Sequence, residues 1–256
     1  MNFNFSILKF YANFKKNINF LGSFFGIFFN PFFIIRRALY VNIKRISPLL
    51  TGKLLDFGCG SKPYKSLFYN AKDYVGIDNY SSSHDHKNSE IDFSYDGKKL
   101  PFKNDEFDSV FSSEVFEHIF NIDEILIELN RVLKINGKLL ITIPFAWEEH
   151  EQPFDFARYT SYGIKFLLEK YKFNILENTK TTTTFLAIAQ VFIAYLSQHV
   201  LPRNIYFYKI FHILIITPLL VLALTINFIL PKRYEYYCNC ILLVEKKKNL
   251  NVNYIS

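Results

Sequence analysis

Residues 54–61, Leu-Leu-Asp-Phe-Gly-Cys-Gly-Ser, decide the fold of this 256-residue chain. They read as a buried strand that ends in an acidic residue and runs into a Gly-x-Gly turn. Glycine lets a backbone turn tightly and come close to a ligand, and doubly wound sheets hold nucleotide-like ligands at such turns. A dinucleotide fingerprint has a third glycine three residues later, where this chain has Pro63. The turn therefore predicts a nucleotide-like ligand without specifying a dinucleotide.

From Lys53 onward, apolar runs alternate with polar stretches that have helical spacing. Alternation of this kind is typical of βαβ units and a parallel sheet. Strands are predicted at 53–57, 74–77, 90–94, 107–112, 138–143, 172–179 and 237–245. Helices are predicted at about 62–70, 122–134 and 160–170, and another is predicted to begin at Asn30-Pro31 and to end at Ser47-Pro48. The sequence thus predicts an α/β protein with a doubly wound, mostly parallel, seven-stranded sheet.

Charge is unevenly distributed along the chain. Residues 1–55 carry eight basic and no acidic side chains, residues 56–177 carry 14 basic and 21 acidic ones, and residues 178–256 carry eight basic and two acidic ones. The basic residues of both flanks occur among Phe, Ile and Leu, a combination that suits an anionic membrane surface. Nucleic-acid enzymes usually place basic residues around the active site. We therefore expect no nucleic-acid partner and a location on the cytoplasmic side of a membrane.

Two apolar segments bear on the membrane. Residues 18–35 are uncharged, and we interpret them as an interfacial segment, with an N-terminal extension packed on the domain as the alternative. Residues 210–230 are long and apolar enough to span a bilayer. A single crossing would leave the strand at 237–245 without partners for its backbone groups. Residues 185–230 are therefore predicted to form a helical hairpin that dips into one leaflet, the alternative being a soluble subdomain with a buried helix.

The predicted domain organisation follows from these segments. It comprises an N-terminal extension and helix at 1–46, a ligand-binding core at 47–180, an apolar helical insertion at 181–234, the last strand of the sheet at 235–248 and a tail at 249–256. Three cysteines are too few for a disulfide scaffold and indicate a reducing compartment.

Two acidic residues follow predicted strands. Asp78 ends the second strand, 18 residues after Gly60, where a carboxylate can accept hydrogen bonds from ribose hydroxyls. Asp78-Asn79 is also a turn signal. Asp96 precedes an apolar turn and can take an adenine amino group, with Phe102 placed to cover the ring.

Together these segments resemble the class I S-adenosylmethionine-dependent methyltransferases, in particular the type 11 methyltransferase domain. The resemblance covers about residues 45–180 and the last strand. It rests on LLDFGCG, on the acid in VGIDNY, on the Asp96–Asp108 stretch, on EVFEHI, on LNRVLKINGKLLITIP and on HEQPFDFARYT. It implies a Rossmann-like methyltransferase sheet and S-adenosyl-L-methionine as cofactor.

The resemblance also implies which residues contact the cofactor. Asp56, Gly58 and Gly60 would shape the pocket of its methionine end, Asp78 would hold the ribose, and Asp96 would hold the adenine amino group. The full set is Asp56, Gly58, Cys59, Gly60, Asp78, Asn79, Asp96, Gly97, Leu100, Ser113 and Glu114. The segment 61–63 departs from the commoner forms of the family, which affects the path of the loop.

A sulfonium methyl group is already activated, so the protein chiefly aligns the attacking atom. An oxygen or nitrogen nucleophile can also need a base, and His118 and His150 are the candidates. A substrate loop is predicted from Glu149, Asp155, Arg158 and Tyr159. Arg158 can hold an acidic group of the acceptor; alternatively, an Asp155–Arg158 pair braces a turn before a helix capped by Thr160 or Ser161.

The predicted function is methyl transfer from S-adenosylmethionine to a small-molecule, glycan or lipid-linked acceptor at a membrane surface. One alternative is an NAD-dependent oxidoreductase, against which Pro63 and the Asp96–Phe102 motif argue. A non-catalytic membrane adaptor is disfavoured by the intact acids, and an RNA methyltransferase by the acidic centre. No metal site is predicted, because the pair His84 and His86 lacks further ligands nearby in the sequence.

Overall fold

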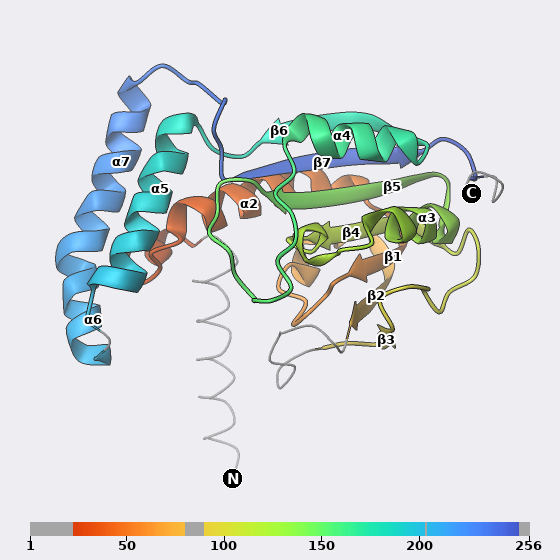
Figure 1. Cartoon of the computed structure of the whole chain (residues 1–256), viewed down its shortest axis with the longest axis horizontal. Helices are drawn as coiled ribbons and strands as arrows, with labels where there is room; N and C mark the ends of the chain where they lie inside the picture. Colours follow the sequence, from red (N-terminus) through yellow and green to blue (C-terminus); the bar gives the residue numbers. More distant parts are fainter. Residues whose placement is uncertain (1–22, 80–89, 203, 251–256) are drawn as a thin grey trace, which may run out of the picture. The chain divides into compact units, whose positions relative to one another are not determined.

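The computed structural model describes residues 23–79, 90–202 and 204–250 (Figure 1). Within them, one sheet has the strand order β3-β2-β1-β4-β5-β7-β6. Its strands are β1 (Gly52–Phe57), β2 (Ala71–Asn79), β3 (Phe93–Tyr95), β4 (Phe107–Ser113), β5 (Leu133–Pro144), β6 (Phe173–Lys180) and β7 (Asn239–Lys246). Only β7 pairs antiparallel with its neighbours, β5 and β6. The predicted seven-stranded, mostly parallel sheet is therefore confirmed.

The helices are α2 (Phe33–Ile46), α3 (Ile122–Val132), α4 (Ser161–Lys170), α5 (Thr184–Tyr195), α6 (Ile205–Phe211) and α7 (Thr217–Ile229). A π-helical turn at Leu196–Val200 extends α5, and another at His212–Ile216 joins α6 to α7. The hydroxyl of Thr160 caps α4 by accepting the N–H of Gly163, as one of the two predicted caps. Asn30 Oδ1 accepts the N–H of Phe32 at 2.9 Å just before α2.

The helix predicted at 62–70 is absent, and the structure has a 3₁₀ turn at Lys65–Leu67 instead. Lys62 has a φ of +49°, outside the helical region, and Pro63 after it offers no N–H to a helix. The rings of Tyr64 and Phe68 pack against Phe111 of β4, with centroids 6.0 and 4.6 Å from it. Aromatic side chains of a non-helical segment thus cover the part of the sheet where a regular helix was expected.

Contacts divide the chain into two compact units. The sheet unit comprises residues 43–180 and 239–256, and the helical unit comprises residues 1–42 and 181–238. Helix α2 contributes to both. Of the segment predicted to be interfacial, residues 18–22 lie outside the described residues, and Phe24–Phe28 form a 3₁₀ helix.

The helical unit is built on a hairpin of two apolar helices. Helices α5 and α7 share a buried cluster that includes Ile193, Ile216 and Leu220, together with Phe33 and Ile34 of α2. The amide of Gln190, fully buried in α5, donates to Pro31 O at 2.9 Å. This bond satisfies a polar group that would be costly to bury alone, and it ties the beginning of α2 to the hairpin.

The two ends of the hairpin are hydrogen-bonded to each other. The N–H of Thr184 donates to Arg233 O at 2.8 Å, and the N–H of Cys238 donates to Thr182 Oγ1 at 2.9 Å. In the sheet, Lys180 of β6 lies opposite Cys240 of β7. The chain therefore leaves the sheet and returns to it at one place, as the predicted hairpin requires.

Replacing Phe111 by alanine tests the core that displaced the expected helix. Phe111 is 2% exposed, and losing a buried Phe side chain typically costs about 3–5 kcal/mol. We expect the free energy of unfolding to fall by that amount in denaturation followed by circular dichroism. Phe166→Ala, at an exposed position of α4, is the control and should change it little. Equal effects of the two variants would contradict this account of the core.

Candidate active site

The Gly58-Cys59-Gly60 turn joins the carboxyl end of β1 to the segment that follows. The N–H groups of Gly58 and Cys59 both donate to Ile77 O of β2, at 2.9 and 3.1 Å. Gly58 has a φ of +75°, and a Cβ there would lie 2.3 Å from Val115 Cγ2. Gly60 has a φ of +46°, but a Cβ there would meet no heavy atom within 4 Å. The first glycine is therefore required by packing, whereas the second faces open space.

Asp78, at the end of β2, is tied directly to this turn. Its Oδ2 accepts the N–H of Gly60 at 2.8 Å, and its Oδ1 accepts the N–H of Asn79 at 2.8 Å. The predicted turn role of this acid is thus observed. The structure also brings together Gly60, Asp78 and Asn79, as the cofactor prediction requires.

Asp56 is a buried acidic residue of β1, two residues before the glycine turn. Its side chain is buried in β1, and Tyr74 of β2 donates its hydroxyl to Asp56 Oδ2 at 2.5 Å. Burial raises the pKa of Asp56 to about 7, although the hydrogen bond from Tyr74 opposes that change. Cys59 is likewise buried, and burial raises the pKa of its thiol. The structure thus places both of these predicted cofactor residues in the buried interior of the sheet unit.

An ion pair that sequence reasoning missed lies beside the turn. The ammonium of the buried Lys62 lies 2.5 Å from Asp92 Oδ2, which also accepts the N–H of Gly76 at 2.7 Å. A Cβ on Gly76 would lie 2.3 Å from Lys62 Cε. In the departing segment 61–63, the side chain of Lys62 therefore lies against Gly76 of β2. A glycine in the middle of a strand indicates that another group approaches the backbone closely, so Gly76 was the signal for this contact.

The predicted adenine end is an exposed turn. Asp96 Oδ1 accepts the N–H groups of Lys98 and Lys99, at 2.9 and 3.2 Å, and these bonds lower the pKa of Asp96. A Cβ on Gly97 would lie 3.2 Å from the side-chain nitrogen of Asn79. The turn after β3 therefore lies next to the end of β2.

Of the apolar residues after that turn, Leu100 belongs to the core and Phe102 is partly buried. Leu100 is buried and donates its N–H to Glu128 Oε2 at 2.8 Å. Phe102 packs against Phe93 and Phe107, with centroids 5.2 and 4.8 Å away.

Glu114 follows β4 with a φ of +56°, a conformation that non-glycine residues rarely adopt. Its Oε1 accepts the hydroxyl of Thr142 at 2.7 Å, and its Oε2 accepts the amide of Asn239 at 2.6 Å. The hydroxyl of Ser113 lies 2.8 Å from that of Thr142. Thr142 and Asn239 were missed, although each is a polar residue within an apolar strand. Thr142 and Asn239 fix the Glu114 carboxylate at the same edge of the sheet as the Gly58-Cys59-Gly60 turn.

His118 and His150 meet, although 31 residues separate them in the sequence. His118 lies on a 3₁₀ turn after β4 and His150 lies in the loop after β5; their ring centroids are 4.8 Å apart. His118 Nδ1 lies 2.7 Å from Phe154 O. Burial lowers the pKa of His118, so its imidazole is neutral near pH 7.

Glu117 is a further residue that sequence reasoning missed. Its side chain is fully buried, and neither carboxylate oxygen has a hydrogen-bond partner. Burial, followed by the charge of Glu114, raises its pKa well above the usual value. Its backbone carbonyl accepts the N–H groups of Phe156 and Ala157, at 2.8 and 3.2 Å, and so anchors the loop that carries His150.

The predicted substrate loop is braced internally. Arg158 forms a bidentate pair with Asp155, whose Oδ2 also accepts the N–H of His150 at 2.9 Å. Arg158 donates further to Glu148 O at 2.9 Å. This is the bracing alternative for the Asp155–Arg158 pair. Glu149 is exposed, and Tyr159 is half-buried with a pKa that burial raises.

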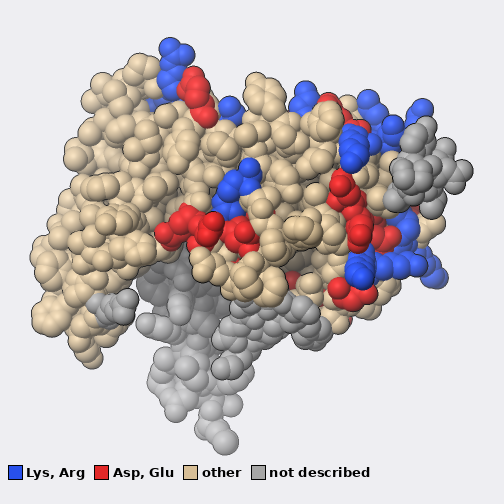
Figure 2. All heavy atoms as spheres, viewed as in Figure 1, with Lys and Arg blue, Asp and Glu red and all other residues tan. Residues whose placement is uncertain are grey.

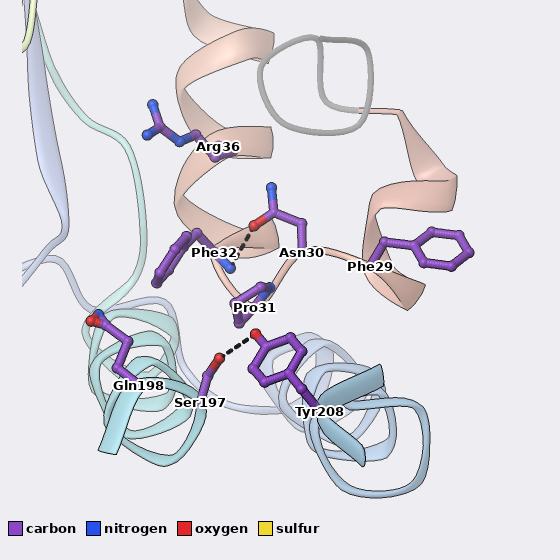
Figure 3. Close-up of a pocket in the computed structure, with 8 residues that line it drawn as sticks. All are labelled: Phe29, Asn30, Pro31, Phe32, Arg36, Ser197, Gln198 and Tyr208. Atoms are coloured by element: carbon purple, nitrogen blue, oxygen red, sulfur yellow. Dashed lines mark hydrogen bonds between the residues drawn. The ribbon is translucent and has the colours of Figure 1, made fainter. Parts of the chain in front are cut away.

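A separate cavity of about 500 Å³ lies in the helical unit (Figure 3). Its lining comprises Phe29, Asn30, Pro31, Phe32, Arg36, Ser197, Gln198 and Tyr208. The hydroxyls of Ser197 and Tyr208 lie 2.7 Å apart on one side of it. None of the predicted cofactor or catalytic residues lines this cavity.

Comparison with known proteins identifies the sheet unit. Residues 55–141 match the family model described as a methyltransferase domain. This match confirms the resemblance seen in the motifs. No curated protein matches the sequence.

Solved structures share the fold at low sequence identity. A chain of the complex between the Haloferax volcanii Trm112 methyltransferase activator and a putative methyltransferase has a TM-score of 0.52 and 15% identity, covering 82% of this chain and 90% of that one. The [4+2]-cyclase SpnF has a TM-score of 0.52 and 18% identity, covering 83% and 82%. Haemonchus contortus phosphoethanolamine N-methyltransferase 2, in complex with S-adenosyl-L-methionine, has a TM-score of 0.51 and 19% identity, covering 88% and 56%.

The two glycines of the turn predict opposite effects of alanine. Gly58→Ala should destabilise the fold, because its Cβ would overlap Val115 at a positive φ. Gly60→Ala should cost only about 1–2 kcal/mol for the left-handed conformation, yet its methyl group would occupy the open space. We expect Gly60→Ala to retain most of its thermal stability but to lose affinity for S-adenosylmethionine in calorimetry. Unchanged affinity in that variant would contradict the placement of the cofactor.

Proposed function

We propose that this chain, which carries a class I S-adenosylmethionine-dependent methyltransferase domain of the type 11 family, methylates a lipid-linked acceptor at a membrane surface. One observation carries the acceptor class: an apolar helical hairpin leaves the sheet and returns to it at the edge that holds the site. Soluble small molecules and free glycans are the acceptors against which this proposal is tested.

The residues of the turn fit the cofactor. S-adenosylmethionine supplies a methyl group already activated on sulfonium, so the protein needs chiefly to bind and align. The open space at Gly60 accepts a ligand close to the backbone. Asp78 is held in place by two N–H groups, and a fixed carboxylate at the end of the second strand suits ribose hydroxyls.

The acceptor side is formed by segments that follow β4 and β5. Ligands of doubly wound sheets bind outside the carboxyl ends of the strands, and both the His118 turn and the His150 loop follow such ends. The neutral imidazole of His118 can take up a proton from an oxygen or nitrogen nucleophile. Exposed Glu148 and Glu149 add acidic character at the loop, which disfavours a polyanionic acceptor such as RNA.

The surface of the helical unit supports the membrane location. Exposed apolar side chains occur along both arms of the hairpin, among them Ile188, Phe192, Ile210, Leu214, Leu222 and Phe228. On the face seen in Figure 2, charged side chains gather over the sheet unit and are sparse over the helical unit. Apolar patches of this kind mark membrane or partner surfaces.

The lengths of the two arms support a hairpin that dips into one leaflet. The arm at Ile205–Ile229 has 25 residues and is long and apolar enough to cross a membrane. The arm at Thr184–Val200 is shorter; at 1.5 Å per residue it reaches about 25 Å, less than the roughly 30 Å of a hydrocarbon core. Lys209, close to the turn between the arms, suits the headgroup level. We therefore place the hairpin obliquely in the cytoplasmic leaflet.

Asp78→Ala tests the cofactor site. Losing a charge-assisted hydrogen bond to ribose should cost about 1.5–3 kcal/mol, or roughly ten- to a hundredfold in affinity. Calorimetry with S-adenosylmethionine measures this loss, and Asp73→Ala, at a more exposed position earlier in β2, is the control. Equal affinity of wild type and Asp78→Ala would refute the assignment of this residue.

Thiol labelling in sealed inside-out vesicles tests the topology. The native cysteines are buried, so single exposed thiols can be introduced at Lys172, before the hairpin, at Lys247, after it, and at Asn204 in its turn. All three should react with a membrane-impermeant maleimide added outside, on the cytoplasmic face. Opposite-side labelling of Lys172→Cys and Lys247→Cys would mean a single crossing, and labelling of Asn204→Cys only from the opposite face would mean that the hairpin crosses twice.

Transfer of a labelled methyl group into cell fractions tests the acceptor. We expect label from S-adenosylmethionine to enter the organic-soluble fraction of membrane extracts when wild-type protein is added, and not with Gly60→Ala. Incorporation only into water-soluble molecules would overturn the proposal of a lipid-linked acceptor while leaving methyl transfer itself intact.

A further inference from the structure

We propose that Glu117, His118 and His150 form a binding site for a divalent transition-metal ion, with Zn²⁺ as the best-suited ion. Each of the three offers one ligand atom, and these atoms lie within 4.8 Å of one another. Two imidazoles and one carboxylate are also the three protein ligands of a common class of catalytic zinc site, which keeps a fourth position open.

The buried carboxylate of Glu117 is the first observation that points to a cation. Its side chain is fully buried and both of its oxygens are without hydrogen-bond partners. Burying a carboxylate without compensation is costly, and such a group in a folded protein calls for a specific partner. Its Oε1 lies 3.6 Å from His118 Nε2, close to the roughly 3.4 Å that separates two ligand atoms around tetrahedral zinc.

The orientation of His118 is the second observation. Its Nδ1 lies 2.7 Å from Phe154 O, so Nδ1 carries the proton and donates it to that carbonyl. The lone pair is then on Nε2, the atom that faces Glu117, so His118 can act as a base only when no ion is bound there. A ligating histidine almost always donates its other N–H to a carbonyl or carboxylate in this way.

His150 also has polar neighbours around one ring nitrogen. Its Nδ1 lies 3.2 Å from Asp155 Oδ2 and 3.3 Å from Glu148 O. The guanidinium of Arg158, which can only donate, lies 3.4 Å from the same nitrogen, so Nδ1 faces two acceptors and one donor. One ring nitrogen of His150 lies within 4.8 Å of the other two ligand atoms, and the Asp155–Arg158 pair that braces the loop becomes the outer support of the site.

A further carboxylate lies at the open side of the cluster. Glu151 Oε2 is 3.8 Å from His118 Nε2, and its side chain is partly exposed, unlike that of Glu117. The His150 loop is fixed to the His118 turn through the carbonyl of Glu117. The three ligands are therefore positioned by backbone hydrogen bonds that exist without the ion, which suits a preformed site.

Metal binding can be measured without any acceptor or cofactor. Tag-free full-length protein in detergent, treated with EDTA and dialysed, is titrated with Zn²⁺ by calorimetry and with Co²⁺ by visible absorption. We expect one ion per chain, a rise in melting temperature with Zn²⁺, and Co²⁺ bands of a four- or five-coordinate site. His118→Ala and His150→Ala should each weaken binding by more than the roughly 10–100-fold typical of losing an outer-shell partner.

Two further variants guard against loss of folding. Glu117→Gln keeps the side-chain volume and should lose most of the metal affinity while retaining the circular dichroism of the wild type. His199→Ala removes an exposed histidine of the helical unit and should bind like the wild type. Failure of the wild type to bind one ion, or equal binding by His118→Ala, His150→Ala and the wild type, would overturn the site. Neither result bears on S-adenosylmethionine binding, which is measured separately.

Discussion

The reversal of strand order on either side of β1 is the constraint on which the rest of this structure depends. From β1 the sheet grows through β2 and β3 in one direction and through β4 and β5 in the other. At such a switch point the connections diverge and leave room outside the carboxyl ends of the strands. The glycine turn after β1, Asp78 after β2, Glu114 after β4 and the histidine loop after β5 all follow such ends, so distant parts of the sequence meet at one edge.

The antiparallel insertion of β7 between β5 and β6 adds a second constraint. Because β6 runs parallel to β5 and β7 runs against both, the end of β6 and the beginning of β7 lie at that same edge. Asn239, the first residue of β7, donates to Glu114. The 58 residues between β6 and β7 must therefore leave from the edge that carries the site and return to it. The apolar helices α5, α6 and α7 are therefore joined at both ends of the insertion to that edge of the sheet.

The regular parts of this arrangement were predictable because they depend on local patterning. Buried parallel strands read as apolar runs, and the switch to helical spacing fixed α3 and α4 to within two residues. The helix predicted at 62–70 failed because Tyr64 and Phe68 have the i, i+4 spacing of a helix face, yet the positive φ of Lys62 and the proline after it leave only a 3₁₀ turn there. The residues assigned to the cofactor were recognisable because most of them end a strand or follow one closely, and their contact with the cofactor stays a prediction. Thr142, Asn239, Lys62 and Asp92 were missed because their roles depend on which strands become neighbours, and spacing in the sequence carries no information about that.

Glu114 and Glu117 are three residues apart at one edge of the sheet, yet their carboxyl groups differ in hydrogen bonding. Glu114 has a hydroxyl and an amide donating to its two oxygens, so its negative charge is compensated by neutral donors from two neighbouring strands. Glu117 has no such donor and is more deeply buried. Neutral donors reaching Glu117 would make it another structural bridge, like Glu114. Instead, the nearest group is Nε2 of His118, whose ring directs its own proton away, toward Phe154 O. Lone pairs and a carboxylate converging on one point repel one another unless a proton or a cation lies between them. The loop is nevertheless anchored to this point by two backbone hydrogen bonds, so the convergence is maintained by the fold, and the proton or cation that it calls for is the feature that distinguishes this edge from a merely structural one.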